Sequence, residues 1–264
     1  MTDGYLDSDD GLSLYFRERV LPGAHAHAVV VHGVSEHYGR YRWVEQRLAQ
    51  ANIGFSMMDL RGHGRSSAPD GEWTVADMGR DIVRLLRQLG AEKANLVGLS
   101  LGGMVAQQFA LDYPYATASL VLVDTIAGPP PGGDQPLREA LAFIEAQPMR
   151  AIAETRIAAA FTDAVDPVMR GHVIEQAALN DKDNYLRAAR ATFSFNVRER
   201  LGEIAAPTLV VVGEQDRTFP MAWMEDVASG IRGARLVRLS GAAHISNMER
   251  PREFNRAVLD FLGV

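Results

Sequence analysis

The hydrophobic pattern of the chain alternates between short, continuously apolar runs and longer segments with helical periodicity. The runs VVV at 29–31 and LVVV at 209–212 lack the alternation of a half-exposed strand, so they predict strands buried on both faces. Strands are expected at residues 12–19, 27–31, 54–59, 95–99, 119–124, 208–213 and 235–239. Helices are expected between them at residues 41–51, 74–89, 101–113, 220–229 and 251–261. This alternation predicts an α/β fold, in which helices cover both faces of a mostly parallel sheet.

One interval departs from the alternation. The segment GPPPGG at 128–133 follows the strand expected at 119–124, and consecutive prolines prevent a helix from continuing through it. From 135 to 197 the pattern is helical without a strand signal, with helices expected at 137–146, 149–161, 167–180 and 184–193. We therefore expect a core domain of residues 1–127 and 198–264, and a helical cap (lid) of residues 128–197 inserted over one edge of the sheet.

Composition narrows the classes of function. The 264 residues include 27 lysines and arginines against 33 acidic residues, a net charge of −6, which lacks the basic field that holds nucleic acid or an anionic membrane. The chain has no cysteine, which excludes disulfides, cysteine nucleophiles and cysteine-ligated metals. Its acidic start, MTDGYLD, is unlike a signal peptide, and no apolar run approaches the roughly 18 to 20 residues that span a bilayer. We expect a cytoplasmic protein with no membrane span and no nucleic-acid partner.

A Gly-x-Ser-x-Gly motif lies between a predicted strand and a predicted helix, in the segment LVGLSLGG at 96–103. This context is typical of a nucleophile elbow, a sharp turn that holds the serine in a strained backbone conformation and exposes its hydroxyl. Gly98 and Gly102 keep side chains out of the crowded flanks of the turn. The motif predicts Ser100 as the nucleophile and the amide of Leu101, at the helix N-terminus, as a donor to a developing oxyanion.

A serine nucleophile needs a base, and the base needs an acid that orients it. His244 lies in the loop SGAAHI after the last predicted strand, at the carboxyl edge of the sheet, where open α/β folds bind ligands. Asp216 follows the preceding strand, and the chain order Ser, Asp, His favours it as the acid. Asp124, at the end of the strand before the cap, and Glu214 are the alternatives.

A second oxyanion donor is expected in the segment HGV that follows the strand at 27–31. Gly33 permits a turn that aims the amide of Val34 inward, and each such amide contributes on the order of 10²–10³ in rate. His32 is better explained as a side chain that braces the loop than as a catalyst.

Two further segments contain glycines or histidines of the kind that often bind ligands. The glycine-rich segment DLRGHGRS at 59–66 fits neither a dinucleotide-binding nor a P-loop pattern, and it predicts a loop braced by Asp59 and Arg61. His25 and His27 would share a face of a strand, but no acidic or cysteine cluster accompanies them. We therefore expect no metal site.

Together these motifs resemble the α/β-hydrolase superfamily over nearly the whole chain outside the cap. The resemblance rests on HGV at 32–34, DLRGHGRS at 59–66, GLSLGG at 98–103, GEQD at 213–216 and His244. It implies an eight-stranded, mostly parallel sheet flanked by helices, with a helical cap inserted after the sixth strand. It also implies a triad of Ser100, His244 and Asp216, oxyanion amides from Val34 and Leu101, and no cofactor. The segments GLSLGGM at 98–104 and AAHISNME at 242–249 resemble 3-oxoadipate enol-lactonases, whereas HGVSEHYGRY at 32–41 is similar to monoglyceride lipases.

Serine as the nucleophile restricts the chemistry to acyl groups, because an alkyl ether formed on serine could not be hydrolysed. We expect an enzyme whose small-molecule substrate is a carboxylic ester or a lactone, enol-lactones included. A carbon–carbon bond hydrolase of vinylogous diketone acids would use the same triad. From a different class, a ligand-binding receptor could retain the same fold without turnover.

Apolar residues of the cap predict that the substrate-binding pocket is largely apolar. The candidate substrate-binding residues are Phe143, Ile157, Phe161 and Phe193. Enol-lactones and diketone acids also carry a carboxylate that requires a buried cation, although arginines on helices are usually solvated. The cap offers Arg138, Arg150, Arg156, Arg187 and Arg190.

Overall fold

The structure is a computed structural model that describes residues 1–8, 10–24 and 26–263. Within these residues eight strands form one sheet in the order β1-β2-β4-β3-β5-β6-β7-β8. The strands are β1 (Thr2–Asp7), β2 (Ser13–Arg19), β3 (Ala26–Val31), β4 (Ile53–Met58), β5 (Ala94–Leu99), β6 (Thr117–Val123), β7 (Thr208–Gly213) and β8 (Arg235–Leu239). The β1–β2 and β2–β4 pairs are antiparallel, and all other neighbours are parallel. The predicted fold class is confirmed.

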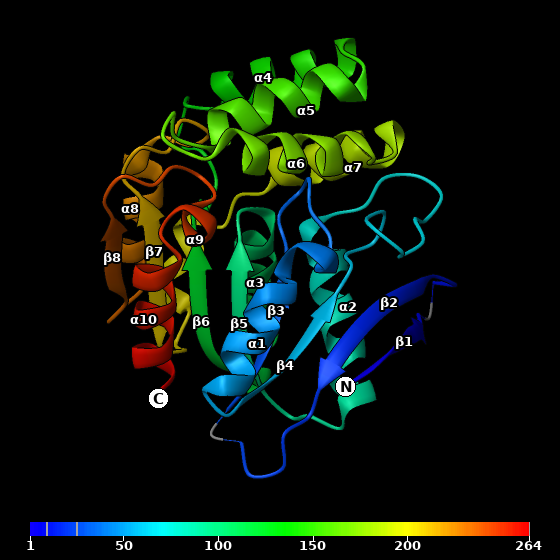
Figure 1. The fold of residues 1–264 in the computed structure, drawn as a ribbon, viewed down its shortest axis with the longest axis vertical. Coiled ribbons are helices and arrows are strands. Elements are labelled where there is room, and N and C mark those ends of the chain that lie inside the picture. Colours follow the sequence, from blue (N-terminus) through cyan, green and yellow to red (C-terminus); the bar gives the residue numbers. More distant parts are fainter. Residues whose placement is uncertain (9, 25, 264) are drawn as a thin grey trace.

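Helices cover both faces of this sheet, as Figure 1 shows. One face carries α1 (Arg42–Gln50) and α10 (Pro251–Leu262), and the other carries α2 (Val75–Leu89), α3 (Leu101–Asp112) and α8 (Met221–Gly230). The apolar run in β3 reflects this arrangement: Val29 belongs to the core cluster that includes Met78 of α2, whereas Val30 belongs to the cluster that includes Leu48 of α1. The shorter helices are η1 (Tyr38–Tyr41), η2 (Pro114–Ala116), η3 (Arg198–Glu203) and α9 (Ser246–Glu249).

The strand β1 was not predicted from the sequence. It is an edge strand that pairs only with β2 among the described residues, with Tyr5 opposite Tyr15. Its sequence, TDGYLD, is mostly polar and exposed, because an edge strand with one open side has little apolar surface to bury. Hydrophobic patterning therefore gives no signal there.

Four α-helices, followed by η3, lie between β6 and β7 in the sequence, and we call residues 128–197, which hold the four α-helices, the inserted segment. They are α4 (Gln135–Ala146), α5 (Met149–Ala160), α6 (Pro167–Ala178) and α7 (Lys182–Ser194). In Figure 1 they form a layer above the carboxyl ends of β5 and β6. The two ends of the segment meet, because the amide of Val197 donates to the carbonyl of Ala127 at 2.8 Å. The chain thus leaves the sheet and returns to it at one place.

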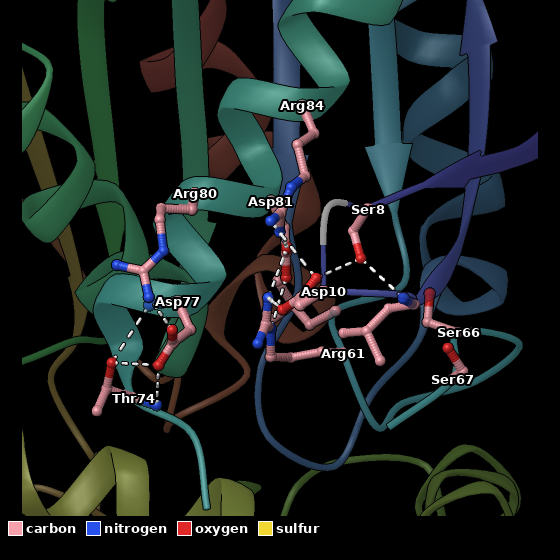
Figure 2. A network of polar contacts seen from close by, with 12 residues as sticks. Ser8, Asp10, Arg61, Ser66, Ser67, Thr74, Asp77, Arg80, Asp81 and Arg84 are labelled. Carbon is pink, nitrogen blue, oxygen red and sulfur yellow. Dashed lines mark hydrogen bonds and ion pairs between the residues drawn. The ribbon is translucent and has the colours of Figure 1, made fainter. Parts of the chain in front are cut away.

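A buried ion-pair network holds the loop after β4 against α2 (Figure 2). The guanidinium of Arg61 donates to both oxygens of Asp81, at 2.7 and 2.8 Å, and reaches Asp10 at 3.2 Å. Burial raises the pKa of Asp81, although the ion pairs with Arg61 and Arg84 oppose this. Asp59 accepts hydrogen bonds from the amide of Tyr38, in η1, at 2.6 Å and from the amide of Arg65, in the loop itself, at 2.9 Å. The glycine-rich segment at 59–66 is thus a braced loop, as its sequence predicts.

Candidate active site

Ser100 lies in the sharp turn between β5 and α3, with φ at +52°. This left-handed conformation is costly for a residue with a side chain, so surrounding contacts must hold it. The amide of Ser100 donates to the Val123 carbonyl at 2.9 Å, and the Thr125 hydroxyl donates to the Ser100 carbonyl at 2.7 Å. A side chain at Gly102 would overlap the carbonyl group of Val31. The glycine is required by this close approach of α3 to β3.

The turn brings the Ser100 hydroxyl to His244, which follows β8. Ser100 Oγ lies 3.0 Å from His244 Nε2, and His244 Nδ1 lies 2.8 Å from Asp216 Oδ2. Because a carboxylate only accepts, the imidazole donates from Nδ1 and its Nε2 is left to accept from the serine hydroxyl. Amides of Thr218 and Phe219 donate to the second oxygen of Asp216, at 2.6 and 3.2 Å, and fix that carboxylate. The arrangement can deliver a nucleophilic oxygen to a carbonyl carbon.

The electrostatic surroundings of His244 favour its charged form. Burial lowers the pKa of His244, but the adjacent Asp216 carboxylate, helped by Asp124, outweighs it and raises the pKa above the ordinary histidine value. A base with such a pKa accepts a proton readily and stabilises the imidazolium that forms when the serine attacks.

Asp124, the alternative acid, lies close by but has other partners. It is buried, and it accepts from the amide of Gly213 at 2.8 Å and from the amide and hydroxyl of Ser246, at 3.1 and 2.6 Å. Burial, reinforced by the charge of Asp216, raises the pKa of Asp124 to about 7. Asp124 therefore joins the end of β7 to the loop that carries His244, whereas Glu214 is exposed.

The two expected oxyanion donors flank Ser100. Val34 lines the cavity above Ser100, and Leu101 is the first residue of α3. Across the described residues, neither of these two amides donates to another protein group. Both are therefore free to donate to an oxygen of a bound acyl group.

Two buried histidines fix the loop that carries Val34. The amide of Leu60 donates to His32 Nε2 at 2.9 Å, and His63 Nε2 lies 3.0 Å from the Val34 carbonyl. Burial lowers the pKa of His32 and of His63 to about 4, so both are neutral near pH 7. His32 thus braces the loop, the role its sequence position suggests.

Glu36 is a buried carboxylate beside the reacting centre to which the sequence analysis gave no role. It accepts from the Gly33 amide at 2.9 Å and from the Tyr41 hydroxyl at 2.5 Å, and it pairs with Arg40 at 2.9 Å. Burial raises the pKa of Glu36, but Arg40 and the two donors outweigh it, so the pKa lies below the usual range. Arg40 also donates to the carbonyl of Val173 in α6 at 3.0 Å. One network thus joins the oxyanion loop to the inserted segment.

A small cavity of about 40 Å³ opens over Ser100. Twelve residues line it: Gly33, Val34, Ser35, Glu36, Leu99, Ser100, Arg156, Ile157, Ala160, Thr218, His244 and Ile245. It has room for on the order of one to three water molecules, so only short groups fit without side-chain movement. A larger open groove of about 750 Å³ lies beside residues 129–132 and 193–200, away from Ser100 and His244.

Of the four apolar residues expected to bind substrate, only Ile157 lines this cavity. Phe143 and Phe193 belong to a cluster between α4, α5 and α7, and Phe161 is fully buried in a cluster between α5 and α6. In this structure the three phenylalanines pack within the helical layer, and their role in substrate binding stays a prediction. The sequence also did not single out Arg156, because helical periodicity does not give the rotation of a helix relative to the sheet.

Neither a metal centre nor a membrane-spanning helix is found in the part of the chain that the structure describes. There, no three or more acidic or histidine side chains gather as a metal site would require. His27 bonds Ser56 at 2.8 Å, and His25 lies outside the described residues. No helix in the described ranges has the length and apolar character needed to cross a bilayer.

The fold and the arrangement of these side chains are typical of an α/β hydrolase, and comparison with known proteins agrees on the family. A family model described as the alpha/beta hydrolase family matches residues 28–257. The chain therefore belongs to the α/β hydrolase family, and it is a hydrolase.

Relatives of known name differ in substrate. The chain is 34% identical over 235 residues to a Variovorax paradoxus (strain S110) protein provisionally named carbamate hydrolase RutD, covering 83% of this chain and 86% of that protein. It is 30% identical over 203 residues to 3-oxoadipate enol-lactonase 2 of Acinetobacter baylyi (strain ATCC 33305 / BD413 / ADP1), covering 76% and 75%. The crystal structure of the enol-lactonase from Burkholderia xenovorans LB400 superposes with a TM-score of 0.89 at 26% identity, covering 98% of this chain and 100% of that one.

Proposed function

We propose that this hydrolase cleaves a carboxylic ester or a lactone through an acyl-enzyme on Ser100. The observation that carries the proposal is the continuous hydrogen-bonded chain from the Ser100 hydroxyl through His244 to Asp216. Ser100, at one end of this chain, lines a cavity with Val34, whose amide donates to no other protein group among the described residues. The proposed nucleophile, the base and the residue that carries an oxyanion amide thus line one small space, and Asp216 contacts the base from outside it.

In the proposed mechanism, His244 Nε2 takes the proton of Ser100 as its oxygen attacks the substrate carbonyl carbon. The amides of Val34 and Leu101 donate to the oxyanion of the tetrahedral intermediate. The imidazolium, stabilised by Asp216, then gives its proton to the leaving alkoxide or enolate oxygen. Water attacks the acyl-enzyme by the same route in reverse and releases the acid.

We further propose that residues 128–197 act as a cap on a core of residues 1–127 and 198–264. The meeting of the segment's two ends and its place above the carboxyl ends of the strands support this division. Arg156, Ile157 and Ala160 of α5 line the cavity, so the cap would shape the site from above. Substrate selection would then lie largely in α5.

Similarity to two enol-lactonases favours an ester or lactone over other acyl substrates. A carbamate also presents a carbonyl to Ser100, and similarity to the protein named carbamate hydrolase makes it the second candidate. Esters or lactones and carbamates differ in the leaving group and in the stability of the acyl-enzyme, so the measured turnover of each substrate distinguishes the two candidates.

The test is a panel of 4-nitrophenyl acetate, 4-nitrophenyl butyrate, a simple lactone, an aryl carbamate and a vinylogous diketone acid. We expect multiple turnovers of the esters or the lactone, an acyl adduct on Ser100 by mass spectrometry, and loss of both in Ser100→Ala. Ser229→Ala, a change at an exposed serine on α8, is the control and should keep full activity. Turnover of the carbamate or the diketone acid alone would overturn the substrate assignment. A single turnover at most, with a ligand-dependent rise in thermal stability, would indicate a receptor.

A further inference from the structure

The arginines of the inserted segment differ in their partners. Three of them pair with carboxylates: Arg138 with Asp134, Arg150 with Glu175, and Arg190 with Glu72 and Glu145. A fourth, Arg187, donates to the carbonyl of Pro69 and lies over the ring of Trp73. A fifth, Arg170, donates to the carbonyl of Thr162 at 2.7 Å. These five fit the usual state of helical arginines, which is a paired or solvated guanidinium.

Arg156 is different, because it lines the cavity with Ser100 and His244. In the described ranges, no carboxylate lies within ion-pair distance of it. Its guanidinium carbon lies 6.0 Å from the centroid of the Phe193 ring, and its charge also acts on the Tyr185 hydroxyl. Burial raises the pKa of the Tyr185 hydroxyl, and the neighbouring Arg156 works against that rise. The guanidinium of Arg156 is thus surrounded by neutral groups and the cavity.

The charges that line the cavity leave an excess of positive charge. Glu36 is the one carboxylate among the lining residues, and its charge is taken up by Arg40 at 2.9 Å and by two further donors. His244 is neutral when it serves as the base. Arg156 therefore contributes a charge that lacks a protein counterion, in a half-enclosed space where electrostatic interactions are strengthened.

We propose that Arg156 binds a carboxylate of the substrate, so that the preferred substrates are esters or lactones of acids that carry a second, free carboxylate. A guanidinium and a carboxylate form charge-assisted, often bidentate hydrogen bonds, which orient the bound molecule as well as hold it. With the distal carboxylate fixed on α5, the ester carbonyl is directed down to Ser100. This inference rests on the proposed function, since it names the substrate class of the same site.

The proposal also links substrate binding to the base. Burial and the charge of Arg156 both lower the pKa of His244, against the stronger opposing effect of Asp216. A bound carboxylate would neutralise Arg156 and remove its share of that effect. The acid limb of the kcat profile should then lie at higher pH than the acid limb of kcat/KM, which reports the free enzyme.

The experiment compares 4-nitrophenyl monoesters of glutaric and adipic acids with the same compounds whose distal carboxylate is a methyl ester. The wild-type enzyme should prefer the free acids. Arg156→Met should lower kcat/KM for the acids about tenfold or more, mainly through KM, and change the neutral diesters less than about threefold. Arg156→Lys should recover part of the loss. Arg150→Met, on the same helix but paired with Glu175 outside the cavity, is the matched control and should change neither.

A second measurement does not depend on turnover of these esters. Free glutarate should inhibit hydrolysis of 4-nitrophenyl acetate competitively in the wild type and in Arg150→Met, and about tenfold more weakly in Arg156→Met. Equal losses on acids and neutral diesters, or unchanged glutarate inhibition, would overturn the role of Arg156 and leave the serine hydrolase in place. If no ester in either series turns over and Ser100 forms no adduct, the proposed function itself has failed.

Discussion

Replacing Glu36 with glutamine tests how the loop that carries the Val34 amide is held. Glutamine keeps the size of glutamate, and its carbonyl oxygen can still accept from the Gly33 amide and the Tyr41 hydroxyl, which now donate at 2.9 and 2.5 Å. Its NH₂ group, however, replaces the oxygen that Arg40 contacts at 2.9 Å. The substitution thus opposes two donors and leaves a guanidinium without its counterion.

The size of the effect follows from burial. The Glu36 and Arg40 side chains are only 5% and 7% exposed, and removing one partner of a buried ion pair costs about 3–5 kcal/mol. Arg40 keeps its hydrogen bond to Val173, so we expect the lower end, about 3 kcal/mol of unfolding free energy. The retained Gly33 contact should limit the loss of kcat to about tenfold, below the 10²–10³ of a lost oxyanion donor.

Urea unfolding and ester hydrolysis at pH 7.5 measure the two effects on one preparation. Glu175→Gln removes an exposed partner of Arg150 on the same inserted segment, and should leave both the urea midpoint and kcat unchanged. If Glu36→Gln unfolds at the wild-type urea concentration and retains the wild-type kcat, Glu36 does not hold the oxyanion loop as described.

Two further predictions concern stability. Asp81→Asn should lower the free energy of unfolding by about 3 kcal/mol, because it leaves the buried Arg61 without its bidentate partner; an unchanged urea midpoint would contradict the role of this ion pair. His32 and His63, with pKa values near 4 in the fold and an ordinary value of 6.5 in the unfolded chain, take up protons more readily when unfolded. Stability should therefore fall as pH drops from 6.5 to 4, by about 3 kcal/mol for each histidine at the lower limit. Urea midpoints that stay constant from pH 7.5 to pH 5 would refute this.

The sequence predicted the central fold because its strands are buried on both faces. Continuous apolar runs such as the one ending at Val31 locate such strands without ambiguity. The edge strand at Thr2–Asp7 was not predicted, because a strand with one open side needs no continuous apolar run. Tertiary pairing with β2, which local patterning does not record, forms it.

The site residues could be predicted where the local backbone structure determines their position. The elbow around Ser100 and the strand-end positions of Asp216 and His244 are set by local sequence and by strand order, and the structure brings the three side chains together. In the inserted segment the residues that face the cavity could not be predicted, because side-chain type and helical period do not give the rotation of a helix relative to the sheet. Phe161 therefore packs inside the helical layer, whereas Arg156 faces the cavity.

Labelling with a fluorophosphonate, followed by peptide mapping, tests whether His244 activates the Ser100 hydroxyl. We expect one stoichiometric adduct, on Ser100, formed rapidly by the wild type and at least a hundredfold more slowly by His244→Ala, on the order of the contribution of a general base. An unlabelled Ser100, an adduct on another serine, or equal labelling rates in the two proteins would contradict it.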